Sequence, residues 1–183
     1  MDTEKELTNI AFVDGQNLHL SIKECGWAVD HAKFRKYLKE KYHVVEAYYF
    51  LGFISADEYD LYDRLQKAGF ILYFREHSSI LKGNKKGNVD SDIIFEIMKK
   101  IAESDVFDKI FIISGDGDYK KLVDYLVKKN KFGKMLFPNT EFASSLYMNL
   151  GGEFFDYLEA EDVKAKISYT KVLSEPAIMK KAP

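Results

Sequence analysis

The chain of 183 residues has one cysteine, Cys25, and three prolines. A single cysteine cannot form an internal disulfide, and it cannot build a cysteine-rich zinc site. No apolar stretch approaches the roughly 20 residues that a membrane-crossing helix needs. The first six residues are polar, so they do not resemble a secretory signal. These absences predict a soluble, cytoplasmic protein that has no membrane partner.

The charges are nearly balanced, with 27 lysines and arginines against 29 aspartates and glutamates, a net charge of −2. Such a balance gives no general attraction to nucleic acids. Lysines nevertheless gather near two acidic motifs and could bind a polyanion there, although a solvated helix face explains the second group equally well. The first group is Lys82, Lys85 and Lys86, and the second includes Lys120 and Lys121. The four histidines are scattered, and no pair has the spacing of metal ligands.

Buried strands alternate with amphipathic helices along most of the chain. Strands are predicted at 8–13, 44–53, 70–74, 109–113, 133–137 and 153–155. Helices are predicted at 30–42, 56–68, 89–103, 119–129 and 141–150, and residues 75–87 form a loop. This order predicts an α/β fold, a three-layer α/β/α sandwich with a central, mainly parallel sheet. We expect one domain over residues 1–158 and a C-terminal extension over 159–183, with a short helix near 160–166.

Four aspartates stand where a strand ends or a helix begins: Asp14, Asp90, Asp116 and Asp118. Each has an ordinary explanation, because aspartate before glycine favours a turn and aspartate at a helix start is a cap worth about 1 kcal/mol. Asp90, however, shares the core-facing stripe of its helix, whereas Asp92 is displaced toward the polar side. Asp92 is therefore predicted to have a supporting role only.

The joint placement of these aspartates is more informative than any one of them. Ligands of parallel sheets bind outside the carboxyl ends of the strands, so the four side chains are predicted to share one pocket. Carboxylates in a small space repel one another unless a cation is bound or some are protonated. Because all the candidate donors are oxygens, the sequence favours Mg²⁺ or Mn²⁺ over zinc.

Three ordered motifs resemble those of the NYN domain, a member of the PIN-like nuclease superfamily, and most closely its LabA-like subgroup. They are FVDGQNL (12–18), KGNVD (86–90) and SGDGDY (114–119), and SSL (144–146) is also similar. The resemblance covers about residues 8–158 and implies a PIN-like sandwich with a divalent-metal ribonuclease site. It implies metal ligands and catalytic residues at Asp14, Asp90 and Asp116, and a further ligand or water-orienting group at Asp118. It also implies substrate-binding or supporting roles for Asn17, Ser114 and Lys86.

We therefore expect hydrolysis of RNA, predicted to be single-stranded, with one or two Mg²⁺ or Mn²⁺ ions. Tyr119, Phe53 and Tyr73 are candidates for stacking on a base. One alternative is a non-catalytic RNA-binding or protein-interaction module that uses the same pocket. Another is a metal phosphatase or other phosphotransferase, but the type with an aspartyl nucleophile needs Asp-x-Asp after the first strand, and residues 14–16 are Asp-Gly-Gln. The sequence does not determine the oligomeric state, and a homo-oligomer is one of the alternatives.

Overall fold

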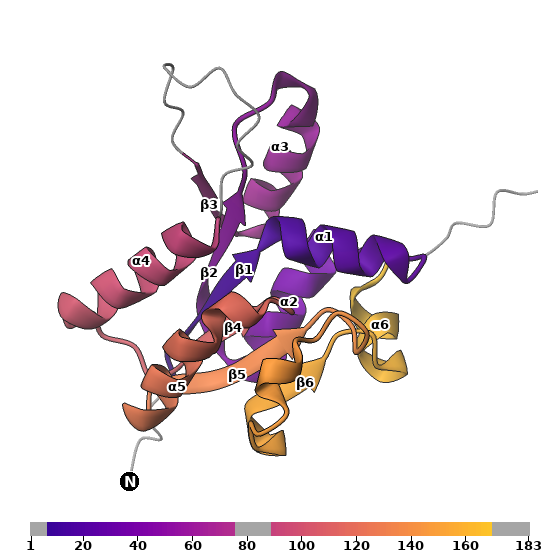
Figure 1. The fold of residues 1–183 in the computed structure, drawn as a ribbon. Coiled ribbons are helices and arrows are strands. Elements are labelled where there is room, and N and C mark those ends of the chain that lie inside the picture. Colours follow the sequence, from indigo (N-terminus) through magenta and orange to yellow (C-terminus); the bar gives the residue numbers. More distant parts are fainter. Residues whose placement is uncertain (1–6, 76–88, 170–183) are drawn as a thin grey trace, which may run out of the picture.

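The computed structural model describes residues 7–75 and 89–169, and it contains a central six-stranded sheet (Figure 1). All neighbouring strands run parallel, in the order β3-β2-β1-β4-β5-β6. The strands are β1 (Asn9–Asp14), β2 (Val44–Leu51), β3 (Ile71–Phe74), β4 (Ile110–Ile113), β5 (Phe132–Phe137) and β6 (Phe155–Tyr157). The predicted α/β class with a parallel sheet is confirmed.

Helices cover both faces of the sheet, which confirms the three-layer sandwich (Figure 1). One buried cluster joins the sheet to α1 (Gly15–Glu24), α2 (His31–Tyr42), α3 (Tyr59–Ala68) and α6 (Glu161–Ile167). The other cluster joins the opposite face to α4 (Asp90–Ala102) and α5 (Lys120–Lys128). Strands that are covered on both faces need apolar residues throughout, and the four residues of β4 are accordingly all buried.

The helix ends follow local signals that the sequence contains. Asp30 caps α2, since its Oδ1 accepts hydrogen bonds from the backbone N–H groups of Ala32 and Lys33, both at 3.1 Å. Gly69 ends α3 with a φ of 91°, a left-handed conformation that glycine adopts without strain. These two helices lie where the sequence predicts them, with α3 preceded by a 3₁₀ turn at Ala56–Glu58.

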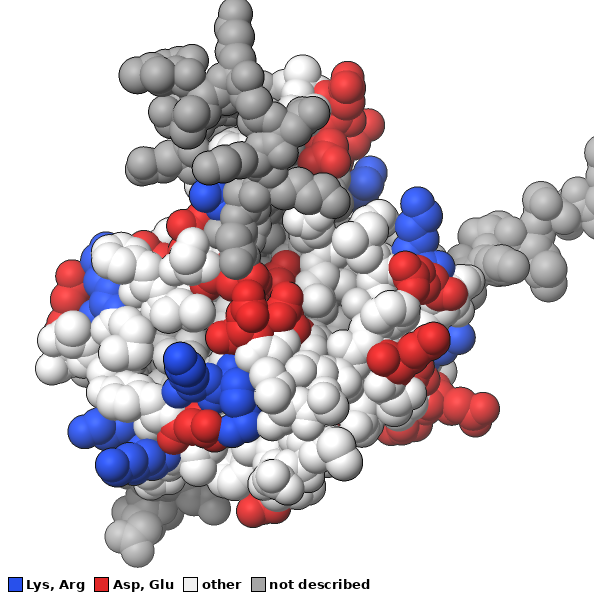
Figure 2. All heavy atoms as spheres, viewed as in Figure 1, with Lys and Arg blue, Asp and Glu red and all other residues white. Residues whose placement is uncertain are grey.

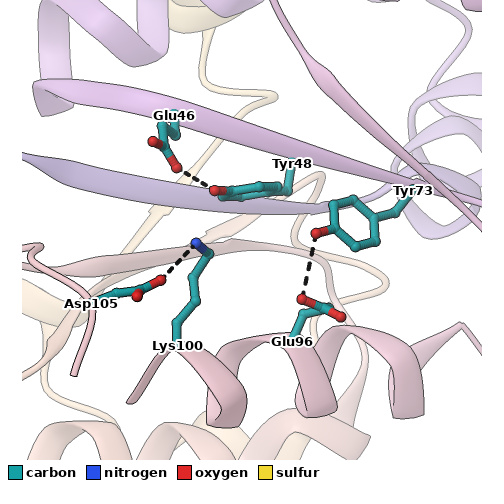
Figure 3. A network of polar contacts seen from close by, with 6 residues as sticks. All are labelled: Glu46, Tyr48, Tyr73, Glu96, Lys100 and Asp105. Carbon is teal, nitrogen blue, oxygen red and sulfur yellow. Dashed lines mark hydrogen bonds and ion pairs between the residues drawn. The ribbon is translucent and has the colours of Figure 1, made fainter. Parts of the chain in front are cut away.

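A polar network fixes α4 against β2 and β3 (Figure 3). The Lys100 Nζ lies 3.2 Å from Asp105 Oδ2 and 4.8 Å from the centre of the Tyr48 ring. The Tyr73 hydroxyl donates to Glu96 Oε2 at 3.5 Å. The Tyr48 hydroxyl donates to Glu46, which is also on β2. Because this network anchors the body of α4, it also sets the position of Asp90 at the start of the helix.

Two sequence predictions are wrong in detail, and one helix was missed. Residues 141–150 do not form a helix; the structure has only a 3₁₀ turn there, at Ser145–Tyr147. The backbone N–H of Ser144 donates to the Gly115 carbonyl at 3.0 Å, so this segment is held by a distant loop rather than by its own helical bonds. The last strand begins two residues later than predicted, and α1 was not predicted at all.

The beginning of the predicted C-terminal extension packs on the domain. The helix expected near 160–166 is present as α6, and its Val163 and Ile167 are buried in the same cluster as α2. An antiparallel bridge between Val29 and Ser168 continues this contact. Within residues 7–75 and 89–169, no helix is long and apolar enough to cross a membrane.

Candidate metal centre at the carboxyl edge of the sheet

The candidate site lies where the strand order changes direction. From β1 the chain continues to β2 on one side, whereas β4 and then β5 follow on the other side. Val13 of β1 is in register with Ile113 of β4, so the residues that follow them, Asp14 and Ser114, are neighbours. Such a switch point in an open parallel sheet creates a crevice outside the carboxyl ends of the strands. The topology therefore places the first and third acidic motifs side by side.

Asp14 is at the bottom of this crevice, and its residue surface is only 5 % exposed. It caps α1, because its Oδ1 accepts the backbone N–H of Asn17 at 3.0 Å. Its Oδ2 accepts a hydrogen bond from the Ser114 hydroxyl at 3.4 Å and lies 3.3 Å from the Tyr119 hydroxyl. Asp14 is thus a helix cap and a buried member of the acidic site at once.

Asp90 reaches the crevice from the first turn of α4 and is 9 % exposed. It is not a helix cap, since Val89 occupies the cap position and makes no side-chain capping bond. Instead, Asp90 Oδ1 accepts a 2.6 Å hydrogen bond from the Tyr119 hydroxyl. The one tyrosine hydroxyl therefore lies between the carboxyl groups of Asp14 and Asp90.

Asp116 and Asp118 belong to the loop and 3₁₀ turn that follow β4. Asp116 Oδ1 accepts the backbone N–H of Asp118 at 3.0 Å, which shapes the turn. Asp90, Asp116 and Asp118 each offer a carboxylate oxygen, and the three oxygens lie within 4.8 Å of one another. Asp116 is partly exposed and Asp118 is exposed. Figure 2 shows acidic side chains gathered at the centre of this face, with a group of basic side chains below them.

The electrostatics of the site are unfavourable without a cation. Burial, and to a smaller extent the nearby charge of Asp90, raise the pKa of Asp14 from 3.8 to about 6, although the hydrogen bonds from Asn17 and Tyr119 act in the opposite direction. Burial also raises the pKa of Asp90, as do the charges of Asp116 and Asp118. Neither Asp116 nor Asp118 forms an ion pair with a lysine or arginine in the described part of the chain.

The structure brings together most of the predicted site residues, but they occupy different positions in the site. Asp14 is outside the group of three carboxylates and lies behind it, in contact with Asp90. Asn17 and Ser114 support the loop: Asn17 Oδ1 accepts the N–H of Gly115 at 2.8 Å, and Ser114 Oγ accepts the N–H of Asp116 at 3.1 Å. Both side chains therefore shape the backbone that carries Asp116.

The predicted lysine contacts and the flanking Asp92 are less central. Lys86, Lys82 and Lys85 lie outside the described residues. Lys120 binds both carboxylate oxygens of Asp124 at 2.5 Å on the surface of α5. Asp92 is not part of the carboxylate group.

Two tyrosines contribute to the site in ways that the sequence does not reveal. Tyr119 is 0 % exposed, so the prediction that it stacks on a base is wrong. Its hydroxyl contacts the carboxyl groups of Asp14 and Asp90 instead. Burial raises the pKa of the Tyr119 hydroxyl, so it stays protonated and acts as a hydrogen-bond donor. The Tyr147 hydroxyl donates to the Asp116 carbonyl at 2.7 Å. An Asp-Tyr pair directly after the turn was the available signal for Tyr119; no local signal indicated Tyr147.

The glycines on either side of Asp116 have a packing reason. A Cβ at Gly115 would lie 2.5 Å from the Phe142 carbonyl oxygen, and a Cβ at Gly117 would lie 2.6 Å from Ser144 Oγ. The segment around Ser144 can approach the acidic turn only because these side chains are absent. The glycines thus build one wall of the site.

Comparison with known proteins shows the family. Residues 9–157 match the NYN domain. The chain belongs to the NYN domain family. Low amplitude and bright protein LabA of Synechococcus elongatus is 24% identical over 127 residues, which are 64% of this chain and 67% of LabA, and it supports the LabA-like subgroup. A solved structure of a Vibrio parahaemolyticus protein of unknown function has a TM-score of 0.73 at 18% identity, covering 92% of this chain and 100% of that one.

These comparisons fix the fold and the family of this NYN domain. The solved structure shares the arrangement of sheet and helices, which shows the fold alone. The family belongs to a nuclease-like superfamily, and the cluster of three acidic residues lies at the sheet edge. A site of this kind has the donor set of a divalent-cation centre.

Proposed function

We propose that this NYN domain is a divalent-metal-dependent ribonuclease that hydrolyses RNA phosphodiester bonds. The observation that supports this most strongly is the group of Asp90, Asp116 and Asp118, whose oxygens converge within 4.8 Å from two separate segments of the chain. An all-oxygen donor set suits Mg²⁺ or Mn²⁺. Carboxylates this close repel one another strongly, and a bound divalent ion would remove that repulsion. The residues present therefore fit the ion that the family relationship suggests.

The carboxylates have different tasks in this proposal. Asp90 would hold the ion from the buried side, and Asp116 and Asp118 would hold it from the more exposed side, where a polyanion can approach. Asp14 orients Asp90 through their shared contacts with Tyr119, and its direct coordination of an ion stays a prediction. A bound divalent ion lowers the pKa of a water molecule and neutralises charge on the phosphate. The Tyr119 hydroxyl keeps Asp90 in place.

A groove of about 470 Å³ next to Asp116 offers space for the RNA strand. It is lined by α1 and by the segment around Phe142, including Asn17, Glu24 and Ser144. Phe142 is 40 % exposed, so its ring is available for stacking on a base, an interaction that tolerates any base type. We infer single-stranded RNA as the substrate, because bases must be unpaired to stack in this way. We assign the activity to the cytoplasm and Lys86 to a phosphate contact, as the sequence predicts.

The test is time-dependent cleavage of end-labelled single-stranded RNA in the presence of Mn²⁺. We expect cleavage by the wild type, none in EDTA, and a loss of about 100-fold or more in Asp116→Asn and Asp118→Asn, because each removes a charged ligand. Asp124→Asn is the matched control, since Asp124 is an exposed aspartate that pairs with Lys120 on α5. It should cleave as the wild type does.

Two results would contradict the proposal. Cleavage that survives in rigorously purified Asp116→Asn would show that another group or a contaminant is responsible. Binding of RNA without any turnover in the wild type, over a range of Mg²⁺ and Mn²⁺ concentrations, would favour the non-catalytic RNA-binding module instead.

A further inference from the structure

A second cavity lies on the other side of α1 from the acidic groove. Its volume is about 450 Å³, within the range of roughly 300–1,000 Å³ that small-molecule sites occupy. Leu18 and Ile22 of α1 face this cavity, whereas Asn17 and Glu24 of the same helix line the acidic groove. α1 therefore separates the two sites, and Gly15, the residue after Asp14, lies in the lining of the second.

The floor of this cavity is apolar and aromatic. Leu18 and Ile22 are both buried, and Tyr49 and Leu51 of β2 add further apolar surface. Trp27, in the connection between α1 and α2, completes the lining on that side, and Lys164 lies 5.5 Å from the centre of its ring. A flat aromatic group is the natural occupant of such a floor, because it gains both buried area and ring contacts.

The charged side chains that line this cavity are both positive: Lys23 comes from α1 and Arg64 from α3. His19 and His31 also line it, but burial lowers the pKa of His31 to about 4, so its ring is neutral at pH 7. No aspartate or glutamate is among the described lining residues, although the protein as a whole carries a net charge of −2. The nearest carboxylate on the same segment, Asp30, is engaged in capping α2. An anionic occupant is therefore favoured over a neutral or cationic one.

Two polar atoms of the lining residues have no hydrogen-bond partner within the described chain. They are the Trp27 Nε1, a donor, and the His31 Nδ1, and both are buried from solvent. Native proteins contain few such atoms. Because each of the two has almost no accessible surface, both lie beneath the lining, and a ligand in the cavity does not reach them. Recognition of a ligand here therefore depends on the apolar floor and on the positive side chains.

We propose that this cavity binds a nucleotide, with the base on the Trp27 side of the floor and the phosphate at Arg64 and Lys23. The shared chemistry, an aromatic heterocycle joined to a phosphate, is offered both by a free nucleoside monophosphate and by one nucleotide of an RNA strand. The site uses none of the four carboxylates of the acidic site. Its occupation therefore does not rest on metal binding or on RNA cleavage.

Trp27 makes the test direct, because it is the only tryptophan of the chain and its emission reports on the cavity alone. The full chain in EDTA is titrated with AMP, GMP, CMP and UMP, with excitation at the red edge of the tryptophan band. We expect a saturable change in emission, and no such change with inorganic phosphate alone. Nucleosides without the phosphate should bind at least about 10-fold more weakly, which corresponds to the loss of one charged contact.

Variants identify the phosphate contacts. Arg64→Gln and Lys23→Gln should each weaken nucleotide binding by about 10-fold. Lys67→Gln is the matched control, since it removes a positive charge from the same helix as Arg64, but Lys67 pairs with Asp63 and does not line the cavity. Asp116→Asn should bind nucleotides as the wild type does, so a failure of the ribonuclease proposal and a failure of this one are distinguishable.

A single-stranded oligonucleotide separates the two sources of the ligand. If a strand occupies the cavity, the oligonucleotide binds more tightly than any monophosphate and displaces it; if free nucleotides do, the monophosphate remains bound. Either result supports nucleotide recognition, provided that Arg64→Gln weakens it. Emission that stays unchanged up to about 10 mM of all four monophosphates would overturn the proposal, as would equal binding by wild type and Arg64→Gln.

Discussion

Charged side chains are arranged differently at the carboxyl edge and at the amino edge of the sheet. At the carboxyl edge, Asp90, Asp116 and Asp118 converge with no lysine or arginine paired to the latter two in the described residues. At the amino edge, each buried or half-buried lysine has acceptors. Lys100 pairs with Asp105, and Lys131 Nζ donates to the Phe107 carbonyl at 2.6 Å.

The difference teaches which end serves stability. Helices α4 and α5 end near the amino edge, where carbonyl groups accumulate negative partial charge, and lysines there are favourable. The carboxyl edge instead concentrates charges of the same sign, which lowers the stability of the metal-free fold. Natural proteins keep destabilising arrangements of residues mainly at functional sites. The carboxyl edge is therefore the region in which we expect the function to lie.

The largest effect should come from adding a cation to the carboxyl edge. Mn²⁺ at about 100 times its dissociation constant should stabilise the wild type by about 2.7 kcal/mol and raise its Tm by about 5–10 °C. Thermal unfolding followed by circular dichroism measures this shift. The double variant Asp116→Asn/Asp118→Asn should lose it, and Asp124→Asn should keep it. An equal shift in all three proteins would show that the ion binds elsewhere.

A smaller effect of the same origin is expected from Asp14→Asn. Burial holds the pKa of Asp14 at about 6, so at pH 8 the folded protein keeps a charge that the unfolded chain solvates better. The contribution of the protonated Asp14 carboxyl to the free energy of unfolding is complete below pH 3.8 and is lost as the pH rises through about 6. In EDTA the variant should therefore be about 2 kcal/mol more stable than the wild type at pH 8, with little gain at pH 4. Urea unfolding at the two pH values measures this, and a loss of stability at pH 8 would contradict the comparison.

The amino edge should respond with the opposite sign. Lys100→Met keeps the apolar stem but removes the ion pair with Asp105 and the contact with the Tyr48 ring. Because the Lys100 side chain is only 16% exposed, we expect a loss of about 1–2 kcal/mol in urea unfolding. Lys36→Met, which removes an exposed pair with Glu40, should cost less than about 0.5 kcal/mol. If both variants cost the same, the amino edge is not built for stability in the way described.

The smallest effect concerns a basic group near the carboxyl edge. Burial, together with the charge of Arg64, lowers the pKa of His31 from 6.5 to about 4. Its contribution to stability is present above pH 6.5 and is lost as the pH falls toward 4, because the unfolded chain binds the proton more readily. In EDTA, the free energy of unfolding of the wild type should fall as the pH is lowered from 7 to 5. In His31→Gln this fall should be smaller by about 1 kcal/mol, as measured by urea unfolding at the two pH values. Parallel pH curves for the two proteins would contradict this.

Much of the fold could be predicted from the sequence, because its signals are local. Apolar runs such as residues 110–113 indicate strands buried on both faces, and Asp30 and Gly69 mark helix ends. The alternation of strands and helices then indicates a parallel sheet, and a parallel sheet places the acidic motifs at one edge. The helix α1 escaped prediction because it begins at a glycine and has only Leu18 and Ile22 as a buried stripe.

What could not be predicted depends on contacts between distant residues. The segment at 141–150 follows the loop around Gly115, not its own helical pattern. The depth of Asp14 behind Asp90 depends on the packing of α4, and the use of the Tyr119 hydroxyl depends on burial. A sequence pattern gives the edge at which carboxylates gather, but not which three of the four converge. That choice is made by tertiary packing.

The central claim is that Asp90, Asp116 and Asp118 hold one divalent ion, and a crystal soaked in Mn²⁺ tests it most directly. We predict an anomalous difference peak between these three carboxylates, with metal–oxygen distances of about 2.2 Å. The same soak shows whether Asp14 also coordinates an ion. Well-ordered carboxylates without a peak at saturating Mn²⁺, or a peak bound elsewhere on the surface, would contradict the claim.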